Sequence, residues 1–365
     1  MKLKVAIIFG GKSAEHEISL VSATNIYRSV DRIIYEPLLL GIDKQNRWCY
    51  HPRYTDGYVD LAERPYFEDA SPVYLRVEDN GAAVVHRQSN QVLETFDVAF
   101  PIIHGTFGED GTLQGFLKSL DIPFTGPDVL ASAVAMDKDV TKRLLRDAQI
   151  PVADFFTLFK HHPSAHSYEE ITRRLGLPVF VKPANSGSSV GVSKAVDKRS
   201  FEQAVADAFR FDNKILVEEA IIGKEVECAV LGNEQPKLSV VGEIVPTKDF
   251  YSYDAKYLSV DGAKLKIPAD IAPDLADAIR QTAAKAYRAI SCEGMARVDF
   301  LLRNDGSFVL NEINTLPGFT AISMYPKLWE HAGILYKDLI TELIQLAVAR
   351  RIRDAKLFRG NEQYA

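Results

Sequence analysis

Features that mark several other classes of protein are scarce in this sequence. Its 365 residues include three cysteines, Cys49, Cys228 and Cys292, which are too few and too far apart for a disulfide framework or a zinc knuckle. We expect them to be buried thiols in a reducing compartment. No apolar run approaches the roughly 20 residues that span a bilayer, and the N-terminal run is too short for a signal peptide. These absences predict a cytoplasmic protein without a membrane segment.

The sequence also carries little net charge. Its 43 basic and 49 acidic residues give a net charge of −6, which argues against a general nucleic-acid binder. His104 has no second histidine at metal-ligand spacing and therefore predicts a poor zinc site. No Ser-His-Asp or Cys-His arrangement indicates nucleophilic catalysis.

Strands and helices alternate in the first part of the chain, which is typical of a parallel sheet covered by helices. The alternation predicts strands at 3–9, 35–42 and 97–103 and a helix at 19–30. We interpret residues of about 45–95 as an insertion into this first unit, with short strands at best. A Gly-Pro pair at 126–127 predicts the linker that ends it.

A second α/β unit and a third, strand-rich unit follow. In the second we predict helices at 129–148, 168–175 and 200–209 and strands at 179–183 and 214–219. In the third we predict strands at 226–231 and 239–245, a helix at 274–289, a hairpin ending at 314 and a helix from 336. The predicted units are 1–127, 128–219 and 220–365.

The hairpin carries the strongest chemical signal. Asp305-Gly306 is typical of a two-residue turn, because glycine tolerates a positive φ. With that turn, Asn304 pairs with Ser307, and the pairing continues outward along both strands. This turn fixes the register of every polar residue farther along the hairpin.

The predicted register brings four polar residues together. Asp299 pairs with Glu312 and Arg297 pairs with Asn314, and side chains two residues apart share a face. Two carboxylates and a carboxamide beside an arginine form a hard-oxygen site suited to Mg²⁺ with bound phosphate. The alternative is an ordinary exposed face of an amphipathic hairpin.

A loop of small residues and two lysines indicate a nucleotide. Residues 185–191 (Asn-Ser-Gly-Ser-Ser-Val-Gly) can bring N–H groups close to phosphate oxygens, although the loop lacks the P-loop ending. A plain flexible loop explains the pattern equally well. Lys182 ends the strand just before the loop and can hold a phosphate. Lys138 lies near the start of a predicted helix, and a lysine at such a position is ordinarily exposed to solvent without a further role.

The predicted strand at 214–219 ends in a polar pair within apolar surroundings. Backbone groups around Glu218, Glu219 and Ile221 can pair with an adenine edge, and Glu225 can accept from ribose hydroxyls. Paired carboxylates also occur at ordinary polar strand ends, and periodicity alone does not choose between the two.

Two segments follow strand ends near the N-terminus. Residues 10–17 lie at the carboxyl end of the first strand, where open α/β sheets bind ligands, and Glu15 or Glu17 can hold an amine. A helix-capping turn with solvated acids is the alternative. Residues 104–111 form a polar turn that we expect to border the same cleft.

Taken together, these motifs resemble D-alanine–D-alanine ligases of the ATP-grasp fold. The resemblance extends over essentially the whole length and is carried by residues 10–19, 104–115, 182–191, 253–257 and 311–318. It implies an α/β and α+β architecture, with an N-terminal parallel-sheet domain and a nucleotide clamp of two subdomains divided as above. The insertion resembles longer variants of this family.

The resemblance also implies a two-step reaction. One D-alanine carboxylate attacks the γ-phosphate of ATP to give an acyl phosphate, and the amine of a second D-alanine then displaces phosphate. Water competes for the acyl phosphate, so the site must close first. The Ser-Gly loop and residues 248–266 would supply the lid.

Roles for individual residues follow from the same resemblance. The implied ligands of two Mg²⁺ ions, with Mn²⁺ as a substitute, are Asp299, Glu312 and Asn314. The implied nucleotide contacts are Lys138, Lys182, Ser186, Gly187, Ser189, Val190, Glu218, Glu219, Ile221 and Glu225. The implied catalytic groups are Arg297, the N–H of Gly318, and a Glu15–Ser188–Tyr257 hydrogen-bond chain. The implied substrate contacts are His104, Lys256 and Ser323.

Some alternatives stay open within the resemblance. Tyr257 favours an amine nucleophile over a hydroxyl one. The nearest rival functions are D-alanine–D-lactate or D-serine ligases and other carboxylate–amine ligases. A nucleotide-binding relative without ligase activity would lack a ligand, a basic residue or a lid element. Ala220 stands where some members carry an aromatic residue, which puts packing at the adenine in doubt. A homodimer is a family expectation, and no nucleic-acid or membrane partner is expected.

Overall fold

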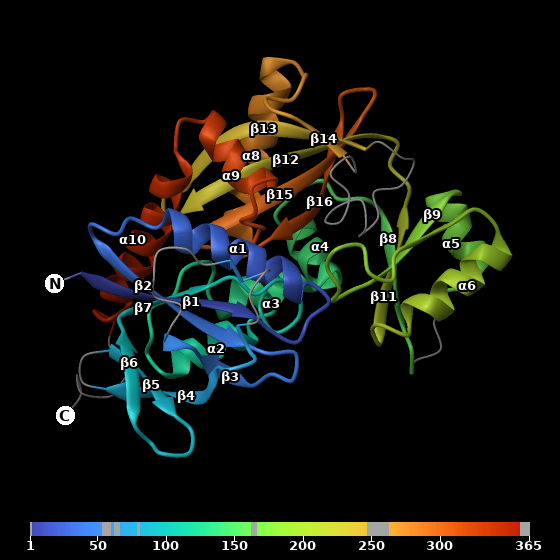
Figure 1. Cartoon of the computed structure of the whole chain (residues 1–365). Helices are drawn as coiled ribbons and strands as arrows, with labels where there is room; N and C mark the ends of the chain where they lie inside the picture. Colours follow the sequence, from blue (N-terminus) through green and yellow to red (C-terminus); the bar gives the residue numbers. More distant parts are fainter. Residues whose placement is uncertain are drawn as a thin grey trace, which may run out of the picture.

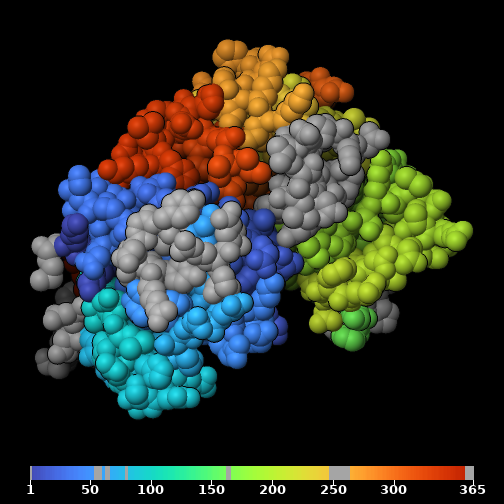
Figure 2. All heavy atoms as spheres, viewed as in Figure 1, coloured from blue at the N-terminus to red at the C-terminus, as the bar shows by residue number. Residues whose placement is uncertain are grey.

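Three β-sheets organise the chain. The computed structural model describes residues 2–52, 60–61, 66–78, 81–161, 166–246 and 263–357. A seven-stranded sheet is formed first along the chain, then a four-stranded sheet and then a five-stranded one. Figure 1 shows the four-stranded sheet set apart from the other two, and in Figure 2 it forms a projecting lobe. Residues 248–262, which include most of the second predicted lid segment, lie outside the described residues.

The first sheet contains β1 (Leu3–Gly10) next to its edge strand. Its strands are β1, β2 (Tyr35–Ile42), β3 (Trp48–Tyr50), β4 (Ser71–Glu78), β5 (Gly81–His86), β6 (Val92–Phe96) and β7 (Val98–Pro101), in the order β6-β5-β4-β3-β2-β1-β7. β1 is parallel to β2 and β7, as predicted, whereas the strands beyond β2 pair antiparallel. The expectation of only short strands in the insertion was wrong, because β4 and β5 form a regular hairpin that extends the sheet.

Helices cover both faces of β1. Val5, Ile7 and Phe9 share a core with α1 (His16–Ser29), whereas Ala6 and Ile8 share one with α2 (Thr112–Ser119). Because side chains alternate along a strand, an almost continuous apolar run is what a strand buried on both faces requires. The turn after β1 therefore emerges at the sheet edge, next to the start of α1.

The four-stranded sheet forms the projecting lobe. Its strands are β8 (Phe155–Phe159), β9 (Val179–Pro183), β10 (Ser193–Ala195) and β11 (Lys214–Glu219), in the order β10-β9-β11-β8. Helices α5 (Tyr168–Leu175) and α6 (Lys198–Ala208) share its apolar core. The loop at 185–191 joins β9 to β10.

The helix predicted at 129–148 is two helices. Asp137 has extended backbone between α3 (Val129–Met136) and α4 (Lys138–Asp147), and its side chain accepts from Val140 N at 3.1 Å. The single-helix prediction was wrong because the apolar pattern continues across an aspartate, a favoured helix N-cap. The break makes Lys138 the first residue of α4.

The five-stranded sheet carries the hairpin. Its strands are β12 (Gly223–Gly232), β13 (Lys237–Pro246), β14 (Ala263–Lys266), β15 (Gly294–Arg303) and β16 (Phe308–Asn314), in the order β14-β13-β12-β15-β16. One face packs on α8 (Pro273–Ala289), and the other on α9 (Met324–His331) and α10 (Tyr336–Asp354). Among the described residues, no helix is long and apolar enough to cross a membrane.

The hairpin turn differs from the predicted one, but the outer register does not. Arg303 N bonds Ser307 O at 2.8 Å, so the turn has three residues and ends at Gly306, whose φ is 85°. An extra residue on β16, Asn311, then restores the register as a bulge. The restored pairs are Asp299 with Glu312, Val298 with Ile313 and Arg297 with Asn314.

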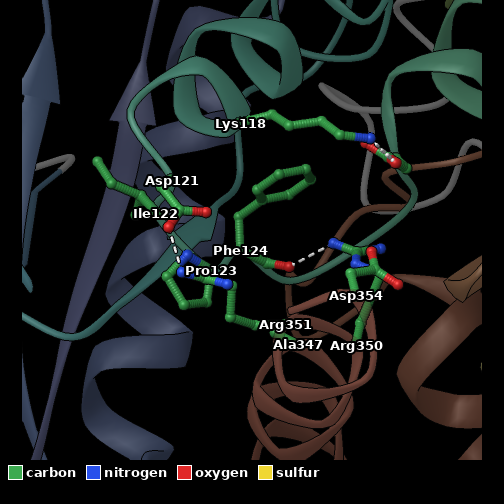
Figure 3. A pocket seen from close by; sticks show the side chains of 10 residues that line it. Lys118, Asp121, Ile122, Pro123, Phe124, Ala347, Arg350, Arg351 and Asp354 are labelled. Carbon is green, nitrogen blue, oxygen red and sulfur yellow. Dashed lines mark hydrogen bonds and ion pairs between the residues drawn. The ribbon is translucent and has the colours of Figure 1, made fainter. Parts of the chain in front are cut away.

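A buried arginine fastens the C-terminal helix to the first unit. Arg350 on α10 donates to Phe124 O and to Gly126 O, each at 2.7 Å. Its guanidinium also stacks 4.7 Å from the centre of the Phe124 ring. Figure 3 shows it directed at the main chain of this segment. The contacts hold the first sheet against the side of the third sheet that carries α10.

Candidate active site

A half-buried arginine on β15 lies between two buried carboxylates. Arg297 donates from Nε to Asp299 Oδ1 at 2.8 Å and from a terminal nitrogen to Oδ2 at 2.7 Å. Its Nε also lies 2.9 Å from Glu227 Oε2 on β12. Burial alone would lower the pKa of Arg297, but the Asp299 and Glu227 carboxylates outweigh burial and raise this pKa well above its ordinary value. The guanidinium is therefore permanently charged.

Strand pairing explains this cluster. Glu227 lies opposite Asp299 in the antiparallel register of β12 and β15, and Glu225 follows on the same face. One carboxylate oxygen from each of these three residues lies within 4.8 Å of the others. Glu312, opposite Asp299 on β16, adds to the charges that raise the pKa of Arg297. Three carboxylates therefore act on the Arg297 guanidinium, those of Asp299, Glu227 and Glu312, and the Glu225 carboxylate lies beside the first two.

The residues predicted as metal ligands fit a hard cation. Asp299 and Glu312 supply carboxylate oxygens, and Asn314 donates its Nδ2 to Asp299 Oδ2 at 2.8 Å. The amide oxygen of Asn314 is then the atom that remains for a cation. An all-oxygen set of this kind is the chemistry that Mg²⁺ prefers in proteins.

A second charged cluster lies where β11 ends. Glu218 Oε2 lies 2.9 Å from Lys182 Nζ on β9, and Oε1 lies 3.3 Å from Lys142 Nζ on α4. All three side chains are buried. Burial would raise the pKa of Glu218, but Lys142 and Lys182 outweigh burial and lower this pKa, so the carboxylate is ionised.

Lys138 joins the two clusters to the Ser-Gly loop. Its Nζ donates to Ser186 O at 2.6 Å. Burial lowers the pKa of Lys138, and the Glu312 carboxylate is the neighbouring charge that opposes this most strongly. Lys138 therefore lies between the Glu312 side of the hairpin and the loop predicted to cover phosphates.

The Ser-Gly loop reaches back to the first unit. Ser188 Oγ donates to a carboxylate oxygen of Glu15, which is the first half of the predicted Glu15–Ser188–Tyr257 chain. Gly105 allows Glu15 to lie there: a Cβ at residue 105 would stand 2.7 Å from Glu15 Oε2, and φ is +79°. Ser188 and Ser189 also have positive φ, of 51° and 59°, so the loop turns sharply at this point.

His104 connects the N-terminal segment to the segment after β16. Its Nε2 lies 3.1 Å from Ser22 Oγ and its Nδ1 3.1 Å from Leu316 O. Burial would lower the pKa of His104, but Glu109, whose Oε1 lies 3.8 Å from Nδ1, outweighs burial and raises this pKa. Ser13 Oγ also donates to His104 O at 2.8 Å. Residues 10–19 and 104–111 therefore lie against each other, and the cleft that we expect them to border stays a prediction.

Gly318 and Ser323 lie close together in the turn before α9. Ser323 caps α9, and its Oγ accepts from Thr320 N at 3.0 Å. A Cβ on Gly318 would lie 2.7 Å from Ser323 Oγ, so any side chain at residue 318 would force the Ser323 hydroxyl to move. The turn holds the N–H of residue 318 and the hydroxyl of Ser323 as neighbours.

Glu219 and Ile221 are not brought together with these groups, whereas Glu225 is. The Glu219 side chain accepts from Asp154 N at 2.9 Å and pairs with Arg303, on the face of β11 opposite Glu218. Ile221 is half-buried beyond the end of β11. Glu225, predicted at the ribose, has its carboxylate among the acidic groups around Asp299.

Of the remaining predicted residues, two contribute only main-chain groups to the Ser-Gly loop, and two lie outside the described residues. Gly187 and Val190 form the turn of the Ser-Gly loop, with Val190 N bonded to Gly187 O at 3.1 Å. Lys256 and Tyr257 lie outside the described residues, so the second half of the Glu15 hydrogen-bond chain stays a prediction.

Sequence reasoning missed three charged residues at the site, of which Glu227 and Lys142 are buried and Glu109 is half-buried. Glu227 is two residues beyond Glu225 on a strand, so the alternation of that strand was a usable signal. Lys142 is one helical turn beyond Lys138, but its contact with Glu218 depends on how α4 packs. Glu109 lies within a segment that was singled out, without an individual role.

Two family profiles match most of this chain, one in its N-terminal part and one in the rest. The family profiles described as "D-ala D-ala ligase N-terminus" and "D-ala D-ala ligase C-terminus" match residues 4–127 and 144–345. D-alanine--D-alanine ligase A from Escherichia coli (strain K12) is 52% identical over 360 residues, which cover 98% of each chain.

Two solved structures are similar over almost the whole chain. The D-alanine-D-alanine ligase from Coxiella burnetii gives a TM-score of 0.86 at 37% identity, covering 100% of this chain and 99% of that one. The VanG D-Ala:D-Ser ligase from Enterococcus faecalis gives 0.84 at 33% identity, covering 95% of this chain and 100% of that one.

Proposed function

Because this chain belongs to the D-alanine–D-alanine ligase family and has its ATP-grasp fold, we propose that it joins two D-alanine molecules at the expense of ATP. The products are D-alanyl-D-alanine, ADP and phosphate, and the dipeptide serves peptidoglycan precursor synthesis. The observation that carries the proposal is the hairpin cluster, where Arg297 is held between buried carboxylates next to the predicted magnesium ligands.

The first step activates a carboxylate. A carboxylate oxygen of the first D-alanine attacks the γ-phosphorus of ATP, the bond to the β-phosphate oxygen breaks, and ADP leaves. Lys138 and Lys182 balance the charge of the nucleotide phosphates, and the backbone of the Ser-Gly loop covers them. Arg297 stabilises the charge on the acyl phosphate from a fixed position, so little reorganisation is needed at the moment of reaction.

The second step forms the peptide bond. The free amine of the second D-alanine attacks the acyl carbon, the tetrahedral intermediate collapses, and phosphate departs with the activated oxygen. Arg297 and the N–H of Gly318 stabilise the oxyanion, while Ser323 and Lys256 hold the carboxylate of the second D-alanine. His104 lies near the first substrate, whose ammonium binds Glu15.

The lid protects the acyl phosphate from water. The hydrogen bond from Ser188 to Glu15 ties the loop of one unit to the residue just before the first helix of another. Closing this link around the substrates excludes water, which would otherwise hydrolyse the acyl phosphate. Tyr257 completes the chain in this proposal.

The acidic cluster supports a two-metal assignment. Asp299, Glu312 and Asn314 would hold two Mg²⁺ ions, with Mn²⁺ as a substitute, and the carboxylates of Glu225 and Glu227 beside Asp299 add oxygen donors of the kind that such cations take. The ions would supply charge neutralisation for the transferring phosphoryl group. The family further supports a homodimer that acts in the cytoplasm.

The identity of the second substrate is the part most open to competition. The similarity to a D-Ala:D-Ser ligase makes D-serine the main rival acceptor, with D-lactate next. Tyr257 supports an amine acceptor over a hydroxyl one. The same cluster serves all three, because each acceptor attacks the same acyl phosphate. D-serine attacks through its amine, as D-alanine does, and differs only in its side chain, whereas D-lactate attacks through a hydroxyl.

A substrate panel tests the proposal. Phosphate release from ATP and Mg²⁺ is measured with D-alanine alone, with L-alanine, and with D-alanine plus D-serine or D-lactate, and products are identified by mass. Release with D-alanine alone, yielding the dipeptide, is expected. Preferential formation of the mixed product would move the assignment to the rival ligase, and no release with any substrate would reject the proposed function.

A further inference from the structure

A buried ammonium group is left over once the ligase residues have been assigned. Lys142 on α4 is 1% exposed, and no described residue forms a hydrogen bond with its Nζ. Its nearest charged neighbour is Glu218 Oε1 at 3.3 Å, and Oε1 likewise has no hydrogen-bond partner among the described residues. The two atoms form a buried ion pair without further hydrogen bonds, and a buried polar group in this state calls for an explanation.

Other charged groups around Lys142 do not explain its burial. Lys182 and Arg146 are cations and oppose a second positive charge, and the Phe155 ring lies 5.7 Å from Nζ. Desolvation of an ammonium group costs several kcal/mol, of the order that a buried ion pair only roughly repays. A packing role would be filled more cheaply by an apolar side chain of similar volume.

The geometry fixes both oxygens of Glu218. Lys182 approaches Oε2 and Lys142 approaches Oε1, from β9 and from α4 respectively. A carboxylate held between two ammonium groups stays ionised and cannot donate a hydrogen bond. Glu218 is therefore an acceptor of fixed orientation at the end of β11, in the region proposed for the adenine.

That property distinguishes purines. Adenine carries an amino group at C6, which donates to such an acceptor. Hypoxanthine and guanine carry an oxygen there, and this oxygen would face a carboxylate with no proton to offer. Sites built to hydrogen-bond one group reject analogues that leave buried polar atoms unpaired.

We propose that Lys142 is a positioning residue for base selection, which holds Glu218 as an ionised acceptor so that the nucleotide site favours 6-amino over 6-oxo purine nucleotides. This inference rests on the proposed function, in which the residues at the end of β11 and in the loop after β9 bind ATP. The lowered pKa of Glu218 agrees with it. Lys142 acts through Glu218 and touches no reacting atom.

The test compares two diphosphates by titration calorimetry. ADP and inosine diphosphate differ at C6, and both are titrated into the wild-type chain and into the Lys142→Met variant with Mg²⁺ present. Arg143→Met is the matched control. Arg143 is the next residue on α4 and pairs with Asp139, another buried carboxylate. The substitution removes this cation from Asp139, but the second cation that pairs with Asp139, Lys214, remains.

The expected results follow from one charge-assisted hydrogen bond. Wild type should bind ADP at least about tenfold more tightly than inosine diphosphate. Lys142→Met should lower the preference for ADP over inosine diphosphate about fivefold or more, chiefly because it weakens the binding of ADP. Its kcat at saturating ATP should stay within about twofold of wild type while the KM for ATP rises. Arg143→Met should leave the preference unchanged.

Other outcomes overturn the inference or the proposed function separately. Equal weakening of both diphosphates in Lys142→Met would show a merely structural lysine and overturn the inference. Equal binding of both diphosphates to wild type would show that Glu218 does not read the base, with the same consequence. Failure of wild type to bind either diphosphate would instead count against the nucleotide site and the proposed function.

Discussion

Replacing Arg297 by alanine should damage catalysis and folding through separate causes. The guanidinium is the proposed donor to the oxyanion, and losing one preorganised donor costs about 3 kcal/mol of transition-state stabilisation, or roughly 100-fold or more in kcat. Its loss also removes the guanidinium that faces Glu227 and Asp299, each 1% exposed. Breaking a buried ion pair in this way costs about 3–5 kcal/mol of folding stability.

The two effects need two assays and one control. Turnover is followed by phosphate release with saturating D-alanine, ATP and Mg²⁺, and the free energy of unfolding by urea denaturation. Arg303→Ala is the matched control on the same strand. Its partner Glu219 is 3.3 Å away, and the two side chains are 31% and 28% exposed, so the change should cost at most about 1 kcal/mol.

Added Mg²⁺ separates the charge effect from general damage. A cation bound among these carboxylates offsets the lost guanidinium, so Mg²⁺ should stabilise Arg297→Ala more than wild type. A folded Arg297→Ala variant with near-native turnover would refute the catalytic assignment. Stability equal to that of the Arg303→Ala control would refute the electrostatic account of the cluster.

Three further predictions follow from other contacts. Asp299→Asn should shift the Mg²⁺ activation curve of the enzyme to higher concentration by about tenfold or more, and an unmoved curve would place the metal elsewhere. Ser188→Ala should release more phosphate per dipeptide, because the link to Glu15 no longer closes the lid, and an unchanged ratio would show that this link does not exclude water. Burial lowers the pKa of Lys142 to about 8 from 10.5, so the unfolded chain binds more protons between these pH values and stability rises with pH there. In urea denaturation, wild type should therefore gain on the order of 3 kcal/mol over Lys142→Met between pH 8 and pH 10.5, whereas a flat difference would show that Lys142 does not titrate in this range.

Elements with a strong local signal were predicted closely. The strands at 35–42, 179–183 and 214–219 and the helix at 168–175 have the predicted bounds. Elements whose signal is short or depends on pairing were not predicted, namely α2, α9, β8, β10 and β14. The break at Asp137 was missed because one capping residue hardly changes an apolar periodicity.

The candidate site was predictable where it depends on strand alternation. The hairpin face of Arg297, Asp299, Glu312 and Asn314 needed only the two-residue period, and the bulge at Asn311 preserved it despite the different turn. Contacts between elements far apart in sequence carried no such signal. The contact of Glu227 with Arg297 depends on the pairing of β12 with β15, and that of Lys142 with Glu218 on the packing of α4. The domain boundaries and the roles of individual residues stay predictions.

The most direct test of the central claim follows the oxygen atoms. D-alanine labelled with oxygen-18 in its carboxylate is turned over with unlabelled ATP and Mg²⁺, and the released phosphate is analysed by mass spectrometry. Activation through an acyl phosphate transfers one labelled oxygen from the carboxylate to each phosphate, and this is the predicted result. Unlabelled phosphate released together with dipeptide would contradict carboxylate activation at this site.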